Sequence, residues 1–306
     1  MPDLKSWFVI INPEAGSGKA LKQWPSIQNQ LKEQGFNFEF SLTEITNQNN
    51  TIIENAIKKG FTKFISIGGD GTLHQVVNAI MKQKIISPNL IKVGIIPIGT
   101  GNDWAKHYNI PTKISLAIST IKRNHILTQD IGKITFLNTK NAPEFFVNIA
   151  GIGFDAFVAK STQKLKRFGA FSYIISALLG MFKFKNFNIK VVTPNKTIVS
   201  KSLMTLIGLC EYSGGKMKLT NSPDPKDGLF DISIIENVSK WEIIKHISKL
   251  YTGNLHKVKK IKMFKSESIL IDIPNTKNLF IQADGEVFKA ENIYISIEKN
   301  VFNFYC

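Results

Sequence analysis

The order of apolar runs and helical patterns in residues 7–123 constrains the fold of this chain more than any other feature. Residues 7–11 are continuously apolar, and the residues after them place apolar side chains at the three- and four-residue spacing of a helix. The same order returns with apolar runs at 63–67 and 93–97, separated by a helical pattern at 73–81. Strands that alternate with helices favour an open, mostly parallel sheet with helices on its faces. In such sheets, ligands bind at the loops beyond the carboxyl ends of the strands.

The sequence pattern changes after about residue 127. Short β-type runs follow one another there, at 145–149, 189–193, 203–209 and 230–235. Turn signals separate these runs, and the capping box Ser239–Glu242 marks one helix. A chain of 306 residues also exceeds the size at which one hydrophobic core keeps growing. We therefore expect an α/β domain at 1–127 and a β-rich domain, a β-sandwich, at 128–306, whose last segment can pack back on the first domain.

The composition of the chain restricts which classes of binding partner and which cellular compartment we expect. There are 39 Lys and Arg residues against 23 Asp and Glu, a net charge of +16, which attracts anionic surfaces such as nucleic acid or lipid headgroups. Cys210 and Cys306 lie far apart without metal-ligand spacing, so the sequence indicates neither a disulfide framework nor a zinc site, and a cytoplasmic setting is expected. No nucleic-acid-binding motif accompanies the charge, so we expect no nucleic-acid partner.

Three glycine-bearing loops follow the predicted strands of the first half, at 12–19, 68–72 and 99–103. Glycine lets the backbone approach a polyphosphate closely, and the helix after each loop presents unpaired N–H groups and the positive end of its dipole. A single loop of this kind is often only a tight turn. The first loop is not a P-loop, because Gly18-Lys19 is followed by Ala20 where that motif has Ser or Thr. Each loop is therefore a candidate for holding nucleotide phosphates.

Together with three later motifs, these loops resemble the diacylglycerol kinase catalytic domain, including its soluble bacterial members and the sphingosine kinases. The later motifs are residues 148–156, 223–231 and 282–286, so the resemblance extends over nearly the whole chain. NAD kinases look like distant relatives that share the loop at 68–72, whereas the loop at 97–103 resembles the lipid kinases. The resemblance implies a NAD-kinase-like α/β domain that binds ATP, a β-rich domain, and a lipid that enters between them.

The resemblance also implies an ATP and Mg²⁺ site in the first domain. Phosphoryl transfer needs a phosphate cradle and a cation shared with phosphate oxygens, and Asp70 matches the residue that organises hydrated Mg²⁺. Lys19 and Lys106 are further candidate cations. Asp103 and Asp130 match acidic positions that line the cleft between the domains, although either could cap a helix or end a strand. The residues expected at the nucleotide site are Asn12, Pro13, Glu14, Ala15, Gly16, Thr43, Gly69, Asp70, Gly71, Thr72, Leu73, His74, Gln75, Thr100 and Asp103.

By the same resemblance, Glu286 is the general base that takes the proton from the lipid hydroxyl. Glu286 and Asp70 are thus the expected catalytic residues. Taken alone, Asp284-Gly285 would indicate a two-residue hairpin turn, and Glu286 would be an exposed strand residue. The companion motifs favour the catalytic interpretation.

A second metal position is implied at residues 224–229. Related bacterial enzymes hold a structural Mg²⁺ there, and the matching residues are Asp224, Asp227 and Leu229, the last through its backbone carbonyl. Oxygen ligands suit this hard cation. A turn rich in Pro, Asp and Gly that binds no ion explains the same residues equally well.

The chain departs from the family pattern at Gln75, where the family commonly has Glu after an Asn or His. An amide keeps hydrogen-bonding ability but loses the negative charge. We therefore expect altered affinity for Mg²⁺ or ATP and not the loss of activity.

The apolar stretch at 168–182 has two interpretations. It could form a helix that packs against the core, or an apolar wall that admits acyl chains. Basic residues flank it, namely Lys164, Lys166, Arg167, Lys183 and Lys185, and they favour peripheral contact with an anionic membrane surface, unless they are merely a solvated face.

The leading hypothesis is an ATP- and Mg²⁺-dependent lipid kinase that converts diacylglycerol to phosphatidic acid. The alternatives are a kinase of the same fold that acts on a sphingoid base, another lipid alcohol or NAD, and a non-catalytic basic protein that binds membrane or nucleic acid. The sequence specifies neither the lipid acceptor nor the oligomeric state, for which a homodimer is one option.

Overall fold

The computed structural model describes residues 6–43, 49–164, 180, 184–215, 217–274 and 279–306. It divides into two compact units, which are Met1–Gln129 with Asn300–Cys306 and Asp130–Lys299. We call them the first and the second unit. Two strands, β5 (Ile126–Phe136) and β17 (Ile293–Tyr305), contribute residues to both.

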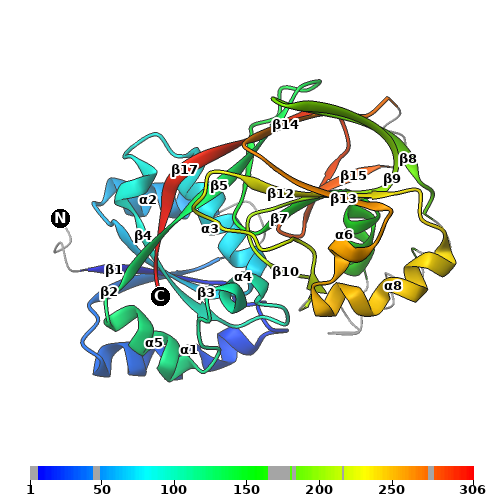
Figure 1. The fold of residues 1–306 in the computed structure, drawn as a ribbon. Helices are drawn as coiled ribbons and strands as arrows, with labels where there is room; N and C mark the ends of the chain where they lie inside the picture. The colour runs from blue at the N-terminus through cyan, green and yellow to red at the C-terminus, as the bar shows by residue number, and fades with distance from the viewer. Residues whose placement is uncertain (1–5, 44–48, 165–179, 181–183, 216, 275–278) are drawn as a thin grey trace. The chain divides into compact units, whose positions relative to one another are not determined.

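Parallel strand pairs build the sheet of the first unit (Figure 1). Its strand order is β2-β1-β3-β4-β17, where the last strand contributes only its final residues. The other strands are β1 (Trp7–Ile11), β2 (Phe38–Leu42), β3 (Lys63–Gly68) and β4 (Lys92–Pro97). The expected mostly parallel sheet is confirmed, and the end of the chain adds one strand to it.

Helices connect the parallel strands and cover both faces of this sheet (Figure 1). Parallel neighbours need such crossover connections because a tight turn can join only antiparallel strands. The helical segments are α1 (Lys19–Glu33), α2 (Asn49–Lys58), α3 (Asp70–Lys82), the 3-10 turn η1 (Pro88–Leu90), α4 (Asp103–His107) and α5 (Ile114–Lys122).

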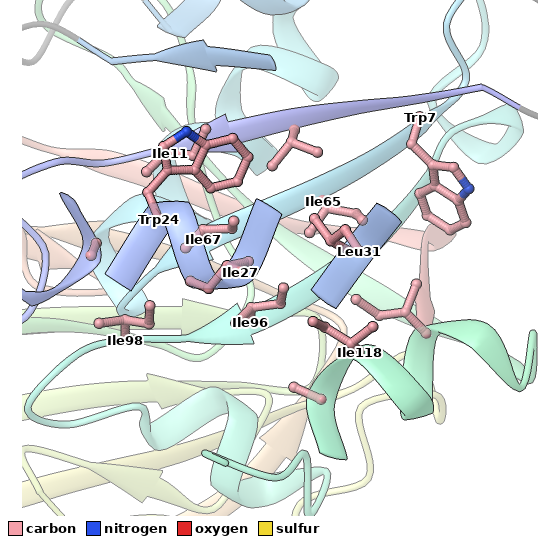
Figure 2. Close-up of a cluster of buried hydrophobic side chains, with 14 of the residues drawn as sticks. Trp7, Ile11, Trp24, Ile27, Leu31, Ile65, Ile67, Ile96, Ile98 and Ile118 are labelled. Carbon is pink, nitrogen blue, oxygen red and sulfur yellow. The ribbon is translucent and has the colours of Figure 1, made fainter. Parts of the chain in front are cut away.

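The main core of the first unit lies between the sheet and helices α1 and α5 (Figure 2). Side chains alternate across a strand, so Trp7, Val9 and Ile11 of β1 face this core. Phe8 instead meets Phe61 with a ring-centroid distance of 5.4 Å. Helix α1 contributes Ala20, Trp24, Ile27 and Leu31, the three- and four-residue spacing that the sequence shows.

Antiparallel strands dominate the second unit. The long strand β9 (Lys196–Gly208) pairs with three neighbours, β7 (Ile149–Gly153), β8 (Phe187–Thr193) and β12 (Phe230–Glu236). The remaining strands are β6 (Glu144–Phe146), β10 (Tyr212–Ser213), β11 (Met217–Lys218), β13 (Ile261–Ser266), β14 (Ser268–Asp272), β15 (Phe280–Ala283) and β16 (Glu286–Lys289). The unit also contains α6 (Phe154–Lys164), α8 (Lys240–Thr252) and the 3-10 turn η3 (Leu255–Lys257).

Two local predictions for the second unit have clear outcomes. The capping box is confirmed, because Ser239 Oγ accepts the Glu242 N–H and Glu242 Oε2 accepts the Ser239 N–H. The apolar run at 145–149 was expected as one strand, but it divides between β6 and β7. The reason is that residues 147–149 give their backbone N–H groups to the Asp284 carboxylate and not to a neighbouring strand.

The apolar stretch 168–182 and its basic neighbours at 166, 167 and 183 lie outside the described residues, apart from Gly180. Its two interpretations stay open. Within the part of the chain that is described, no helix is long and apolar enough to span a membrane.

Helix α1 offers a direct test of the first core. Ile27 is fully buried, so Ile27→Ala should lower the free energy of unfolding by about 2–5 kcal/mol through lost contacts and a cavity. Leu21 of the same helix is 49% exposed, and Leu21→Ala should change it by no more than about 0.5 kcal/mol. Urea titration followed by circular dichroism measures both variants. Equal effects would contradict the assignment of the buried face.

Candidate active site

The three glycine-bearing loops of the first unit follow neighbouring strands of the parallel sheet. They come directly after β1, β3 and β4, and lead into α1, α3 and α4. The registers align the strand ends, because Ile11 pairs with Ile67 and Ile67 pairs with Ile96. The loops therefore emerge at one edge of the sheet, where ligands bind in open α/β folds.

Hydrogen bonds join the first loop to the second. The side-chain amide of Asn12 donates to Thr72 Oγ1 at 3.0 Å, and the Asn12 N–H donates to the Ile67 carbonyl at 3.1 Å. Asn12 Oδ1 also accepts the N–H of Glu14, which shapes its own loop. The predicted residues Asn12 and Thr72 are thus in contact, although they lie 60 positions apart.

Glycines allow the loops to approach one another closely. A Cβ placed on Gly99 would overlap the backbone of Gly69, at 2.7 Å from its Cα. Gly16 has a φ of +62°, and a Cβ there would lie 3.2 Å from the Ile98 side chain. A side chain at Gly99 would push the second and third loops apart, whereas Gly16 is required mainly because its left-handed φ favours glycine.

Asp70 connects the second loop to the third. It is the first residue of α3, and its carboxylate oxygens accept the N–H groups of Asp103 at 3.1 Å and Trp104 at 3.2 Å. The Asp103 carboxylate lies near the same place, because a Cβ on Gly101 would be 3.0 Å from Asp70 Oδ2 and 3.6 Å from Asp103 Oδ2. Two carboxylates at a loop edge suit Mg²⁺, which typically binds through one or two carboxylates and keeps several waters.

The remaining predicted nucleotide-site residues vary in exposure. Thr43 is buried at the end of β2, where its N–H donates to the Ile11 carbonyl. His74 is also buried, and its Nε2 lies 3.2 Å from Asn78 Nδ2 one helical turn away. Leu73 is buried, Gln75 is partly buried, and Glu14 and Thr100 are exposed. Contact of each with a nucleotide stays a prediction.

Glu286 follows a tight turn in the second unit. β15 and β16 form a hairpin in which Ala283 pairs with Glu286, and the two residues between them have positive φ angles, +49° at Asp284 and +90° at Gly285. Such angles are typical of a type I′ turn, so the two-residue hairpin that Asp284-Gly285 indicates by itself is present. Glu286 is partly buried at the start of β16. The hairpin does not test its catalytic role.

Hydrogen bonds of Asp284 connect this turn to residues 147–149. Its carboxylate accepts three backbone N–H groups, from Val147 at 2.9 Å, Asn148 at 2.9 Å and Ile149 at 3.1 Å. The Asp284 N–H donates to the Ile149 carbonyl. Charge-assisted hydrogen bonds of this kind are the stronger ones in proteins. The sequence indicated a turn at Asp284 but not this role.

Gln282 connects the turn to the buried carboxyl group of Asp155. Gln282 Oε1 accepts the Gly285 N–H at 2.8 Å, and Gln282 Nε2 donates to Asp155 Oδ2 at 2.7 Å. Burial raises the pKa of Asp155 to about 6, against the opposing effect of the Gln282 hydrogen bond. Gly151 makes room for the pair, because a Cβ there would overlap the Asp155 carboxylate and crowd the Gln282 amide. Asp155 and Gln282 lie within quoted motifs, but the sequence did not mark them as partners.

At the predicted second metal position, the ammonium group of Lys265 forms ion pairs with the carboxylates. Asp227 Oδ2 lies 2.7 Å from Lys265 Nζ, and Asp231 Oδ2 lies 3.5 Å from the same atom. Burial alone would lower the pKa of Lys265, but the two carboxylates raise it overall. Asp227 Oδ1 accepts the Leu229 N–H, and Asp224 Oδ1 accepts the Lys226 N–H. The side chains that would bind Mg²⁺ thus have other partners, and a metal site here stays a prediction.

Asp130 supports the same loop. It is buried, its N–H donates to the Pro225 carbonyl, and its Oδ2 accepts the Gly228 N–H at 2.9 Å. These bonds hold residues 225–228 in place, which is a structural role that the sequence left open. Among the described residues, no cluster of three or more His, Cys, Asp or Glu side chains could hold a metal ion.

Comparisons with known proteins identify the family. The family model of the diacylglycerol kinase catalytic domain matches residues 6–134, and that of the YegS C-terminal NAD kinase beta sandwich-like domain matches residues 148–303. The chain belongs to the diacylglycerol kinase family of lipid kinases. The predicted family, and the succession of a mostly parallel α/β domain and a β-sandwich-like domain, are confirmed.

Relatives match this lipid kinase along most of its length. The Bacillus subtilis protein YtlR, named provisionally as a lipid kinase, is 31% identical over 93% of the chain and 94% of its own. A diacylglycerol kinase of Staphylococcus haemolyticus is 30% identical over 91% and 81%. A crystal structure of a diacylglycerol kinase from Bacillus anthracis has a TM-score of 0.75, covers all of this chain and 98% of its own, and is 19% identical, which supports the fold alone.

The buried acid should make the stability of the kinase depend on pH. Between about pH 4 and 6, Asp155 is charged in the unfolded protein but still neutral in the folded protein, and above pH 6 it must be charged while buried. The free energy of unfolding should therefore fall as pH rises from about 4 through 6, by up to about 3 kcal/mol, and stay level above that. Asp155→Asn keeps the acceptor oxygen and should remove most of this loss, whereas Asp272→Asn on β14 should not. Denaturation at pH 4 and 7.5 tests this, and an unchanged profile in Asp155→Asn would contradict it.

The Lys265 ion pairs predict how the loop at 224–229 responds to metal. Lys265→Met removes the cation that pairs with Asp227 and Asp231. The free energy of unfolding should therefore fall by about 1 kcal/mol, which lowers the melting temperature. Added Mg²⁺ should restore the melting temperature, because it replaces the lost positive charge. Lys262→Met on the same strand removes the Lys262–Glu236 pair and is the matched control. Chelation of metal should not change the melting temperature of the unaltered protein. A clear decrease on chelation would instead support a resident Mg²⁺ at this loop.

Proposed function

We propose that the protein transfers the γ-phosphoryl group of ATP to the hydroxyl of a membrane lipid, with diacylglycerol as the acceptor and phosphatidic acid as the product. Family membership supports the kinase chemistry. The observation that carries the nucleotide assignment is the contact of three loops at one edge of the parallel sheet, through Asn12–Thr72, Gly69–Gly99 and Asp70–Asp103.

The loop edge has the properties that a polyphosphate needs. α1 and α3 begin there, so their first N–H groups and the positive ends of their dipoles face this edge. Gly18, where a Cβ would meet nothing within 4 Å, leaves the backbone accessible to phosphate oxygens. Lys19, exposed at the first turn of α1, can add a positive charge.

Asp70 and Asp103 would hold hydrated Mg²⁺ at this edge. When bound, the ion balances the charge that develops on the phosphoryl oxygens. Asp70 is well held for this purpose, because the two N–H groups of α4 fix the direction of its carboxylate.

Glu286 is proposed as the general base. Its carboxylate takes the proton of the lipid hydroxyl as that oxygen forms a bond to the γ-phosphorus, and the bond from this phosphorus to the bridging oxygen of ADP breaks. The Asp284 and Gln282 hydrogen bonds hold the turn that precedes Glu286. A fixed backbone restricts the positions of the carboxylate and so favours proton transfer.

The proposed setting is the cytoplasmic face of a membrane. ATP is available in the cytoplasm, the acceptor resides in the bilayer, and the net charge of +16 favours contact with anionic headgroups.

The test is transfer of labelled γ-phosphate from ATP in mixed micelles. The acceptors are diacylglycerol, sphingosine, other lipid alcohols and NAD, each with and without Mg²⁺. Transfer to diacylglycerol is expected, and Glu286→Gln should lower kcat by about 10²–10⁴-fold through loss of the base. Asp70→Asn keeps an acceptor oxygen for one of the two α4 N–H groups and loses the negative charge, so it should raise the Mg²⁺ concentration needed for half-maximal rate.

Two exposed carboxylates provide matched controls for this assay. Glu33→Gln in the first unit and Glu267→Gln in the second should leave the rate unchanged. Transfer to sphingosine or NAD alone would replace the proposed acceptor. A wild-type rate in Glu286→Gln would overturn the assignment of the base, and no transfer to any acceptor would favour a basic binding protein.

A further inference from the structure

Helix α8 of the second unit presents an exposed tryptophan. Trp241 is 80% exposed, whereas the other three tryptophans, Trp7, Trp24 and Trp104, are 8%, 7% and 1% exposed. Trp241 lies in the first helical turn, and Tyr251 in the last turn is 50% exposed. Trp241 thus places at the surface a large apolar ring with a polar N–H, a combination that is enriched where a protein meets the boundary between water and an apolar phase.

Lysines surround this tryptophan. The segment 240–262 contains seven Lys residues and a single acidic residue, Glu242. Glu242 pairs with Lys260 at 2.8 Å, and Lys262 pairs with Glu236 at 2.7 Å. The ion pairs found among the described residues do not include Lys245, Lys249, Lys257 or Lys259. The segment therefore carries a clear excess of positive charge.

The geometry of α8 places the tryptophan and a lysine on one face. Trp241, Lys245, Ser248 and Thr252 follow one another at spacings of four, three and four residues, and all are exposed. Lys257 and Lys259 are also exposed just beyond the helix. We call this outer face of α8, together with residues 256–259, the α8 surface.

The inner side of the helix is fixed to the unit. Leu250 packs against the core cluster that contains Ile149, Leu206 and Met217. The capping box at Ser239 closes its N-terminus, and Gly253, with a φ of +72°, ends it. Because the helix is anchored from within, the exposure of Trp241 is a property of the fold and not of a loose end.

We propose that the α8 surface docks onto anionic phospholipid bilayers, with Trp241 at the level of the headgroups and the lysines against their negative charges. Tryptophan is enriched at membrane–water interfaces, where its ring is apolar and its N–H stays wet. Basic residues near an anionic leaflet add electrostatic attraction. The inference rests on the proposed function, because an acceptor that resides in a bilayer requires the kinase to bind there.

Tryptophan fluorescence tests docking without ATP or an acceptor lipid. Vesicles of equimolar phosphatidylcholine and phosphatidylglycerol should shift the emission of the protein to shorter wavelength and protect it from acrylamide, because Trp241 is the accessible tryptophan. Brominated phosphatidylcholine in the vesicles should quench the same emission. Vesicles of pure phosphatidylcholine, or about 1 M salt, where the Debye length is about 3 Å, should abolish the effect.

Variants distinguish binding through the α8 surface from a general effect of the net charge. The double variant Lys245→Gln/Lys257→Gln should lower the vesicle partition coefficient roughly 25-fold, since each lysine near an anionic surface contributes about fivefold. Trp241→Ala should weaken cosedimentation with vesicles as well. The control Lys22→Gln/Lys32→Gln removes two exposed lysines from α1, an equal change of charge, and should bind vesicles nearly as well as the unaltered protein.

The outcomes distinguish docking from catalysis. Equal losses in the α8 and α1 double variants, or vesicle binding unaffected by Trp241→Ala, would overturn the α8 surface. A fluorescence shift with single-stranded RNA and none with vesicles would also overturn it in favour of a nucleic-acid partner. Vesicle binding through α8 without phosphoryl transfer in the micelle assay would support docking while contradicting the kinase proposal. The α8 variants should keep the micelle rate, because α8 supplies no residue to the proposed chemistry.

Discussion

Parallel pairing of β1, β3 and β4 is the constraint on which the candidate nucleotide site depends. The registers Ile11–Ile67 and Ile67–Ile96 end the three strands at one level, so the loops after them must share an edge. The glycines then decide how closely these loops approach, as the Gly69–Gly99 contact shows. The buried face of α1 holds the sheet that sets this register, since apolar burial is the main driving force of folding. The core and the site are therefore linked through the strand ends.

In the second unit, carboxyl groups fix the position of the turn before Glu286, and the burial of one of them lowers the stability of the fold. Asp284 accepts three backbone N–H groups, and Gln282 joins the same turn to the buried Asp155. A carboxyl group with a pKa of about 6 indicates that burial of its charge is unfavourable. Buried acidic groups with raised pKa values are common near functional sites, where a fixed geometry matters more than maximal stability. The position of the turn before Glu286 is consistent with that pattern.

The distribution of positive charge explains why a large net charge does not define one partner by itself. Lys265 neutralises Asp227 and Asp231 within the fold, and Lys260 and Lys262 are paired with glutamates. Such lysines contribute little to long-range attraction. Lysines outside the ion pairs of the described residues, such as Lys245 and Lys257 of the α8 surface, act on partners outside the protein. The composition alone cannot separate these two groups, because pairing depends on contacts between different elements.

The sequence by itself determined the order of strands and helices in the first half, the β-rich second half, the capping box of α8 and the Asp-Gly hairpin, because each depends on local periodicity or local backbone preference. It also located the three loops through their glycines. Only the tertiary structure decided that Asn12 meets Thr72, that Asp70 holds the start of α4, that Lys265 pairs with Asp227, and that Asp155 reaches Gln282. These partners lie 33 to 127 positions apart, so their contact follows from strand register and packing, which no local pattern encodes.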